Sequence, residues 1–210
     1  MVGCNGYRHP SLYAKIASTV DVASHGRLYA GLGAGWYEHE WKAYGFTWTD
    51  VPERMGAFRE AVEIVHKMWT EDEPVFSGRH YSIDKPINEP QGVRRPHPSL
   101  WLGGGGERVT LKLVAQFADA CNVGAGDPDL IRRKLAVLRE HCDRLGRDYD
   151  RIIKSTNLEL GLKESTADTA GRVARVVEAG ADYVNFYIPR VAYDHEPLLR
   201  LAEELIPQFA

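Results

Sequence analysis

Two hydrophobic periods alternate along this chain. Short apolar runs that end at glycine or at a polar turn are typical of buried parallel strands. Between these runs, apolar residues recur every three or four positions, which is the spacing of a helix with one buried face. The pattern predicts strands at residues 28–32, 100–102, 120–123, 152–162 and 183–188, and helices near residues 12–20, 55–69, 109–117, 127–146, 166–179 and 196–206.

Capping residues support several of these helices. Asp50 is placed to cap a helix, with Glu53 three residues later, as in a capping box. Asp127 and Pro128 open another helix, and Gly146 ends it, in line with the preferences of helix ends. Since strands that alternate with helices form βαβ units, we expect an α/β fold with a parallel sheet.

The same units fit either a doubly wound sheet or a TIM-type (β/α)₈ barrel. A complete barrel repeats the unit about eight times, and the five predicted strands fall short of that number. Residues 1–6 look like the end of a further strand, so we expect the chain to start in mid-fold, either as a short natural protein or at an internal methionine. We expect one domain over residues 1–210, with a hairpin at 75–81 and a loop at 86–98 inserted between two strands.

Composition narrows the class of partner. The chain has 210 residues, is 44% hydrophobic and carries a formal net charge of −3 that is spread along the sequence. This charge pattern recommends neither nucleic acid nor a membrane surface, and no apolar run is long enough for a membrane span. We therefore expect a cytoplasmic protein that acts on small molecules. The 3 cysteines form no Cys-x-x-Cys pair and the 8 histidines show no ligand spacing, so no metal site is expected.

Candidate chemistry gathers at two glycine-rich strand ends. The first is a run of four glycines between a predicted strand and a predicted helix: Gly103, Gly104, Gly105 and Gly106. Backbone amides in such a run converge on a phosphate at the helix N-terminus. The second is an alternating set: Gly31, Gly33 and Gly35. In a barrel both would open on the C-terminal face, where ligands bind, and a purely steric turn is the alternative for each. The second set lacks the full dinucleotide fingerprint.

Aromatic and titratable side chains surround the second set. The aromatic residues, which either wall a flat ring or pack on one another, are Trp36, Tyr37, Trp41 and Tyr44. The candidates for general acid or base, with surface solvation as the alternative, are His9, Glu38, His39 and Glu40. Lys154 is interpreted as a snorkelling lysine rather than a Schiff-base nucleophile. The sequence assigns no catalytic residue.

Several motifs occur in a fixed order. They are Tyr7-Arg8-His9-Pro10, Gly26-Arg27-Leu28, Gly31-Leu32-Gly33-Ala34-Gly35-Trp36, Ala43-Tyr44-Gly45 and Trp101-Leu102-Gly103-Gly104-Gly105-Gly106, followed by residues 117–122 and 180–183. In this order and spacing, the chain resembles the luciferase-like monooxygenases, specifically their F420-dependent oxidoreductase branch. The resemblance covers nearly the whole chain.

The resemblance implies a (β/α)₈ barrel in which the five predicted strands are the fourth to the eighth, and residues 3–5 end the third. It implies a cofactor in the barrel mouth, coenzyme F420 or alternatively FMN. The cofactor-binding residues that it implies are Gly3, Cys4, Asn5, Gly33, Ala34, Gly35, Trp36, Gly103, Gly104, Gly105 and Gly106. Sugar-phosphate dehydrogenases of the family have an acidic glutamate where this chain has Trp36, so a sugar phosphate is not expected as substrate.

The expected function is hydride transfer between F420 and an organic substrate, with the cofactor supplying the chemistry. An FMN-dependent monooxygenase of the same fold is one alternative, and a non-catalytic flavin-binding or truncated barrel is another. Because an open barrel leaves unpaired edges, expected at the strands near Leu28 and Tyr183, we predict a homodimer.

Overall fold

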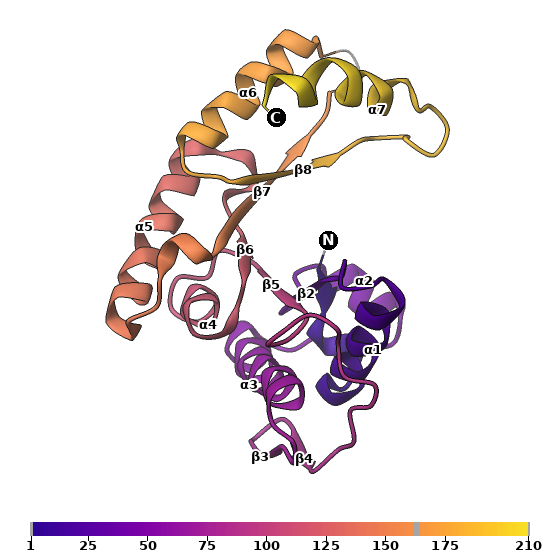
Figure 1. Ribbon diagram of the computed structural model, residues 1–210, viewed down its shortest axis with the longest axis vertical. Helices are drawn as coiled ribbons and strands as arrows, with labels where there is room; N and C mark the ends of the chain where they lie inside the picture. Colours follow the sequence, from indigo (N-terminus) through magenta and orange to yellow (C-terminus); the bar gives the residue numbers. More distant parts are fainter. Residues whose placement is uncertain (1, 162–163, 210) are drawn as a thin grey trace.

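The computed structural model describes residues 2–161 and 164–209. Strands and helices alternate along it (Figure 1). The strands are β1 Gly3–Cys4, β2 Tyr29–Gly33, β3 Val75–Ser77, β4 Ser82–Asp84, β5 Ser99–Gly103, β6 Ala120–Asn122, β7 Ile153–Glu159 and β8 Tyr183–Tyr187. The helices are α1 Pro10–Ala23, α2 Glu38–Ala43, α3 Val51–Thr70, α4 Thr110–Phe117, α5 Pro128–Leu145, α6 Thr166–Glu178 and α7 Glu196–Arg200.

One parallel sheet organises the molecule. Its 6 strands follow the order β1-β2-β5-β6-β7-β8, and every neighbouring pair is parallel. Successive strands are connected through helices, as parallel pairing requires. The predicted α/β class is confirmed, and so is an incomplete barrel that contains the end of a further strand before β2.

One edge of the sheet differs from the expectation. The strand near Leu28 was expected to be an open edge, and this is wrong over part of its length. β1 pairs there through Gly3 with Leu32 and through Cys4 with Gly33. Two residues suffice to cover only the carboxyl end of β2, so its first part carries no β1 partner. On the opposite side, β8 is the last strand of the sheet, as expected.

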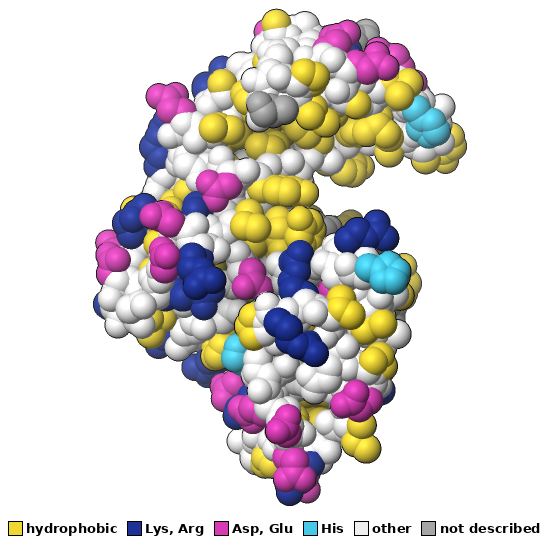
Figure 2. Space-filling view, viewed as in Figure 1, with side chains coloured by type: hydrophobic (Ala, Val, Ile, Leu, Met, Phe, Trp, Pro, Cys, Tyr) yellow, Lys and Arg dark blue, Asp and Glu magenta, His cyan; other side chains and the backbone are white. Residues whose placement is uncertain are grey.

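The sheet curls as it does in a barrel. The ring centroids of Tyr29 on β2 and Tyr183 on β8 are 6.3 Å apart, although 3 strands separate them in the sheet. Trp101 on β5 packs against both rings, at 4.7 and 5.3 Å. The outline is C-shaped, with α6, α7 and β8 in the upper arm and α1, α2 and α3 in the lower part (Figure 1). Hydrophobic side chains gather on the concave side (Figure 2).

The convex face of the sheet packs against the helices and forms the core. Leu32, Leu102 and Cys121, from three neighbouring strands, are at most 2% exposed and share one cluster with Phe58 of α3. Burying one such leucine contributes about 2 kcal/mol of transfer free energy. Strand residues of this parity therefore point outward to the helices, and the alternate residues face the concave side.

The predicted helix ends are confirmed at two helices. The Asp50 carboxylate accepts a hydrogen bond from the Glu53 amide at 2.8 Å, at the start of α3. Asp127 caps α5 in the same way. Gly146 ends α5 with a φ of 64°, a left-handed conformation that suits glycine.

The hairpin β3–β4 lies between β2 and β5 in the chain, which confirms the predicted insertion. Its second strand starts at Ser82 rather than at residue 80. The reason is Glu60 of α3, whose carboxylate accepts hydrogen bonds from the amides of Arg79, His80 and Tyr81 at 2.8–3.0 Å. Burial alone would raise the pKa of Glu60, but these three donors lower it below its usual value.

Other element ends differ from the prediction. The strand expected over residues 152–162 is β7, which ends at Glu159, and Leu162 lies outside the described residues. The closing helix is α7 followed by a π turn, Leu201–Leu205, and a 3₁₀ turn, Ile206–Gln208. Helix α2 was not predicted, because its six residues contain a single buried side chain, Trp41. None of the helices in the described part is long and apolar enough to cross a membrane.

Candidate functional site

One row of register partners joins the carboxyl ends of β1, β2, β5 and β6 and continues into the first half of β7. The register places Cys4 beside Gly33, and Gly33 beside Gly103. Asn122 follows beside Gly103, and Ser155 beside Asn122. Ligands of parallel α/β folds bind at the carboxyl ends of strands. We call this row of register partners the rim.

Packing of one indole shapes the turn after β2. A Cβ at Gly35, whose φ is 81°, would lie 2.6 Å from the Cys4 sulfur and 2.8 Å from the Trp41 ring. A Cβ at Gly6 would lie 1.9 Å from the same ring. Trp41 is 6% exposed, so its ring fills the space that two side chains would need. Both glycines are thus required by packing.

Cys4 lies beneath this turn. Burial raises the pKa of its thiol, and the negative charge of Glu40 raises it further. Because a thiolate is the reactive form, Cys4 is a poor nucleophile near neutral pH. Its place at the rim does not make it a candidate for covalent catalysis.

The turn after β5 is open instead. Gly104 has a φ of 122° and donates its amide to the Asn122 carbonyl at 3.2 Å. Among the described residues, the amides of Gly105 and Gly106 form no hydrogen bond. A Cβ at Gly105 would meet only the flexible chain of Lys134, at 3.2 Å, and one at Gly106 the Thr110 hydroxyl, at 3.0 Å. The two amides therefore remain available as donors, and Gly106 is exposed.

Basic side chains from α5 stand beside this open turn. Lys134 is 2.7 Å from the Glu107 carboxylate, and Arg133 is 3.8 Å from it. The hydrogen bond from Lys134 lowers the pKa of Glu107 below its usual value. Two cations against one carboxylate leave a positive balance next to the free amides, and α4 begins at Thr110. Amides, a helix start and cations are what a phosphate needs, so the residues fit the phosphate end of a flavin-type cofactor.

The other predicted cofactor residues are not all on the rim. Gly3 faces the convex side, since a Cβ there would meet Tyr13 of α1 at 3.7 Å. Asn5 is 5% exposed, and its amide donates to the Tyr81 hydroxyl at 3.2 Å. Trp36 is 85% exposed. The structure therefore brings together Cys4, Gly33, Ala34, Gly103, Gly104, Gly105 and Gly106 along the rim, and leaves Gly3, Asn5 and Trp36 turned to other surroundings.

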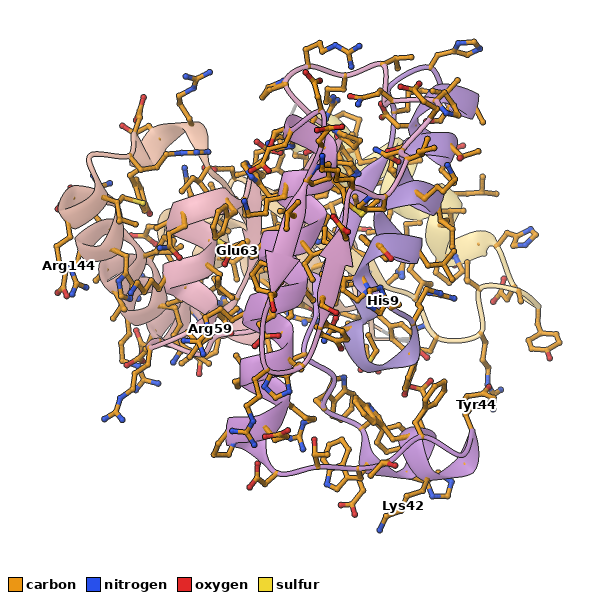
Figure 3. The ribbon with its side chains drawn as sticks, turned by 90° about the horizontal axis from the view of Figure 1, so that it is seen from below. His9, Lys42, Tyr44, Arg59, Glu63 and Arg144 are labelled. Atoms are coloured by element: carbon orange, nitrogen blue, oxygen red, sulfur yellow. The ribbon has the colours of Figure 1, made fainter. Side chains whose placement is uncertain are left out.

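The aromatic residues after β2 do not form one wall. Trp41 is buried, whereas Trp36, Tyr37 and Tyr44 are 85%, 48% and 72% exposed. Tyr44 projects from the end of α2 at the edge of the molecule, as does Lys42 (Figure 3). Only Trp41 is part of the protein interior, and its role there is packing.

Three of the four acid and base candidates have polar partners, and the fourth, His39, lies 5.9 Å from the Tyr37 ring. His9 caps α1, because its Nδ1 accepts a hydrogen bond from the Ser11 amide at 3.3 Å. Glu40 accepts a hydrogen bond from the Tyr7 hydroxyl at 2.6 Å. Glu38 forms an ion pair with Lys42 on the exposed surface. These contacts explain the residues without a catalytic role.

A cavity of about 240 Å³ lies beside the turn after β2, and its wall includes Ala34, Asn5 and His80. Arg54, also in the wall, lies 3.7 Å above the Trp48 ring and donates to the Thr49 carbonyl. Sequence reasoning missed Arg54. An arginine in the first turn of an amphipathic helix reads as a solvated residue, so no local signal could have identified it.

Sequence reasoning also missed a group of amides next to the open glycine turn. The side chains of Asn122 and Asn157 exchange two hydrogen bonds of 3.1 Å each. Asn122 donates to Ser155 as well, at 3.0 Å, and Ser155 donates to the Cys121 carbonyl. Ser155 and Asn157 are two positions apart on β7, the spacing of residues on one face of a strand. This spacing shows that they share a face, but not that this face is the concave one.

The side chain of Lys154 lies on the opposite face of the sheet from Ser155 and Asn157, because neighbouring residues of a strand alternate between faces. Its ammonium is 2.9 Å from the Asp182 carboxylate and 4.9 Å from the Tyr149 ring centroid, and its side chain is 9% exposed. It is tied to structural partners on the convex side. No group of three metal-ligating side chains occurs in the described part of the chain.

Comparison with known proteins agrees with this geometry. The family model of luciferase-like monooxygenases matches residues 2–196. The chain belongs to the luciferase-like monooxygenase family. This confirms the resemblance at the level of the family, whose F420-dependent and FMN-dependent members are both similar to the chain.

Two curated relatives illustrate these two cofactor dependences. An FMNH₂-dependent dimethylsulfone monooxygenase from Pseudomonas putida is 32% identical over 185 residues, which are 82% of this chain and 51% of the relative. An F420-dependent glucose-6-phosphate dehydrogenase from Microbacterium testaceum is 28% identical over 147 residues, covering 69% of this chain and 42% of the relative. The chain spans about half the length of the curated relatives it matches.

Solved structures of the family share the fold. An F420-dependent secondary alcohol dehydrogenase, in complex with an F420-acetone adduct, has a TM-score of 0.78 at 17% identity, covering 91% of this chain and 74% of that one. A long-chain alkane monooxygenase has a TM-score of 0.80 at 14% identity, covering 99% and 68%. At such identities the likeness supports the barrel architecture and nothing finer.

Proposed function

We propose that the open glycine turn holds the phosphate of coenzyme F420, and that the whole protein is an F420-dependent oxidoreductase of an organic substrate. The main support is that the backbone amides of Gly105 and Gly106 form no hydrogen bond among the described residues. The side chain of Lys134 lies next to Gly105, and α4 begins at Thr110. F420, when bound, exchanges a hydride with the substrate. The residues of this chain bind and orient the cofactor, because the amides of Gly105 and Gly106 and the ammonium group of Lys134 hold its phosphate.

An FMN-dependent monooxygenase is the second candidate. It is supported by the relative with 32% identity, which is named as FMNH₂-dependent. The phosphate chemistry at Gly105 and Gly106 is the same for both cofactors, so this candidate uses the same turn. A sugar phosphate is not our proposed substrate, because the family resemblance implies an acidic glutamate for sugar-phosphate dehydrogenases at the position of Trp36, which is exposed here.

We also propose that residues 1–210 act as one domain and associate as a homodimer. The support is the β8 edge, which is the last strand of the sheet and ends at Tyr187, whose side chain is 66% exposed. Apolar surface beside an unpaired strand favours self-association. Sedimentation velocity tests this, and a stable, soluble monomer contradicts it.

Titration of the purified chain with F420 and, separately, with FMN tests the main proposal. Tryptophan fluorescence and the emission of each ligand report binding. Saturable micromolar binding of F420 and weaker binding of FMN support the oxidoreductase. A clear preference for FMN favours the second candidate, and absence of binding for both contradicts the cofactor site.

A further inference from the structure

The rim changes its chemistry between β5 and β8. At β5 it offers backbone amides and basic side chains, as described above. From β6 to β8 it offers neutral side chains, since Asn122 and Asn157 form their reciprocal pair there. The register continues this row directly, because Asn157 on β7 lies beside Asn185 on β8. Three amide side chains thus follow one another across three neighbouring strands.

The amides of this row keep unused hydrogen-bonding capacity. Asn122 donates both of its side-chain N–H groups, one to the Ser155 hydroxyl and one to the Asn157 side-chain oxygen. Asn157 donates one N–H group to the Asn122 side-chain oxygen. Asn185 donates once, to the Thr156 carbonyl at 3.4 Å. A side-chain amide has two donors and one acceptor oxygen with two lone pairs, so Asn157 and Asn185 each keep a donor and acceptor capacity among the described residues.

An apolar layer adjoins these amides. Asn185 lines a small cavity of about 40 Å³ together with Tyr29, Trp101 and Tyr183, the three rings that meet across the curled sheet. A ligand that reaches Asn185 therefore meets aromatic rings on one side and amides on the other.

Charge is nearly absent from this part of the concave face. Among the strand residues of β6, β7 and β8 that face it, none is Lys or Arg, and the single acid is Glu159 at the end of β7. Lys154 is on the opposite face, bound to Asp182. A phosphate placed here would find no positively charged partner on these strands. A neutral group needs no such partner, so its binding is not weakened by the lack of one.

We infer that Asn157 and Asn185 determine substrate specificity, and that they select an uncharged organic molecule bearing a carbonyl or hydroxyl group. The polar group accepts or donates a hydrogen bond at the two amides, and the apolar part packs on Tyr29, Trp101 and Tyr183. This inference rests on the proposed oxidoreductase function, because it assigns the substrate side of the same mouth. It commits the cofactor phosphate to the β5 side and the substrate to the β7–β8 side.

Ligand-observed NMR on the purified chain tests the inference, with cyclohexanone, cyclohexanol and glucose 6-phosphate as probes, each with and without F420. We expect saturation transfer to the two neutral probes, and none to glucose 6-phosphate. Asn185→Leu should weaken binding of the neutral probes about fivefold, the effect of one lost neutral hydrogen bond. Gln116→Leu, at an exposed position of α4, is the matched control and should bind like the wild type.

Asn185→Asp is the second variant. It keeps the size of the side chain and should also weaken the neutral probes, so a folding defect in Asn185→Leu does not decide the result. Preferential binding of glucose 6-phosphate, lack of binding of all probes, or unchanged affinities in both Asn185 variants would overturn the inference. A purely structural amide would leave the selectivity between probes unaltered.

The same samples separate this inference from the proposed function. F420 affinity should be equal in the wild type and in Asn185→Leu, since the phosphate is assigned to the β5 side. If F420 and FMN both fail to bind while the neutral probes respond to Asn185, the cofactor proposal fails and the amide site stands. If F420 binds and the probes ignore Asn185, the substrate inference alone fails.

Discussion

Gly35 and Gly105 each lie two residues beyond the end of a parallel strand, and Gly33 and Gly103 before them are neighbours in the register. By sequence both belong to glycine-rich turns that suit a phosphate. Their surroundings differ: the Cβ of Gly35 would collide with Cys4 and Trp41, whereas that of Gly105 would meet only the end of a lysine chain. A glycine is explained by what its missing side chain would touch: packing requires Gly35, whereas no rigid neighbour requires Gly105.

The largest expected effect comes from Gly35→Ala. Its new Cβ, 2.6 Å from the Cys4 sulfur and at a φ of 81°, should cost about 3 kcal/mol from overpacking and a left-handed conformation. The melting temperature should fall by about 6–12 °C, measured by calorimetry. Gly45→Ala is the control: its φ is 77° and nothing lies within 4 Å, so it should lose only about 1 kcal/mol. Equal losses in the two variants would show that Trp41 does not explain Gly35.

Gly105→Asp should weaken cofactor binding and leave the stability of the fold nearly unchanged, which is the reverse of what we expect for Gly35→Ala. The fold should tolerate it, because Lys134 can move away, while a carboxylate beside the free amides repels phosphate. We expect F420 affinity to fall at least about tenfold, and the melting temperature to stay close to that of the wild type. Gly171→Asp, where the nearest atom to the Cβ is 3.9 Å away, adds the same charge on α6 and should leave binding unchanged. Unaltered F420 titration curves in Gly105→Asp would remove the phosphate from this turn.

Lys134→Gln should have the smallest effect. The loss of one partly exposed cation should weaken F420 binding about threefold, more so at low salt. The pKa of Glu107, held low by Lys134, should rise towards its ordinary value. In the wild type the Lys134–Glu107 pair is therefore complete above the unfolded-state pKa of Glu107 and is lost as pH falls through the lower folded-state value. NMR titration of the Glu107 carboxyl checks the shift, and an identical titration curve in Lys134→Gln would contradict the pairing.

The sequence predicted the parts of the fold that depend on local rules. The caps at Asp50 and Asp127 and the buried runs that became β2 and β5 follow from side chains within a few positions of one another. The end of a strand before β2 was predicted from residues 1–6 themselves, and β1 is there. Element ends shifted where a distant group intervened, as Glu60 does at the tip of the hairpin.

The candidate site was less predictable, because its meaning depends on contacts between distant residues. The sequence singled out both glycine turns but could not separate them, since the collision of Gly6 and Gly35 with Trp41 joins three places in the chain. It expected four aromatic residues after β2 either to wall a flat ring or to pack on one another, and of these only Trp41 is buried. The amide row was missed because Asn157 and Asn185 become neighbours only through the strand register, and Asn122 reaches Asn157 only through side-chain hydrogen bonds.

The most direct test of the central claim is an NMR titration of the ¹⁵N-labelled chain with F420, following the backbone amides of the two turns. The account predicts large shifts at Gly105 and Gly106, smaller ones in Lys134 and the first turn of α4, and little change at Gly35. Inorganic phosphate at higher concentration should reproduce the shifts at Gly105 and Gly106. Shifts concentrated at Gly35, with Gly105 and Gly106 unmoved at saturation, would contradict the account and assign the phosphate to the turn after β2.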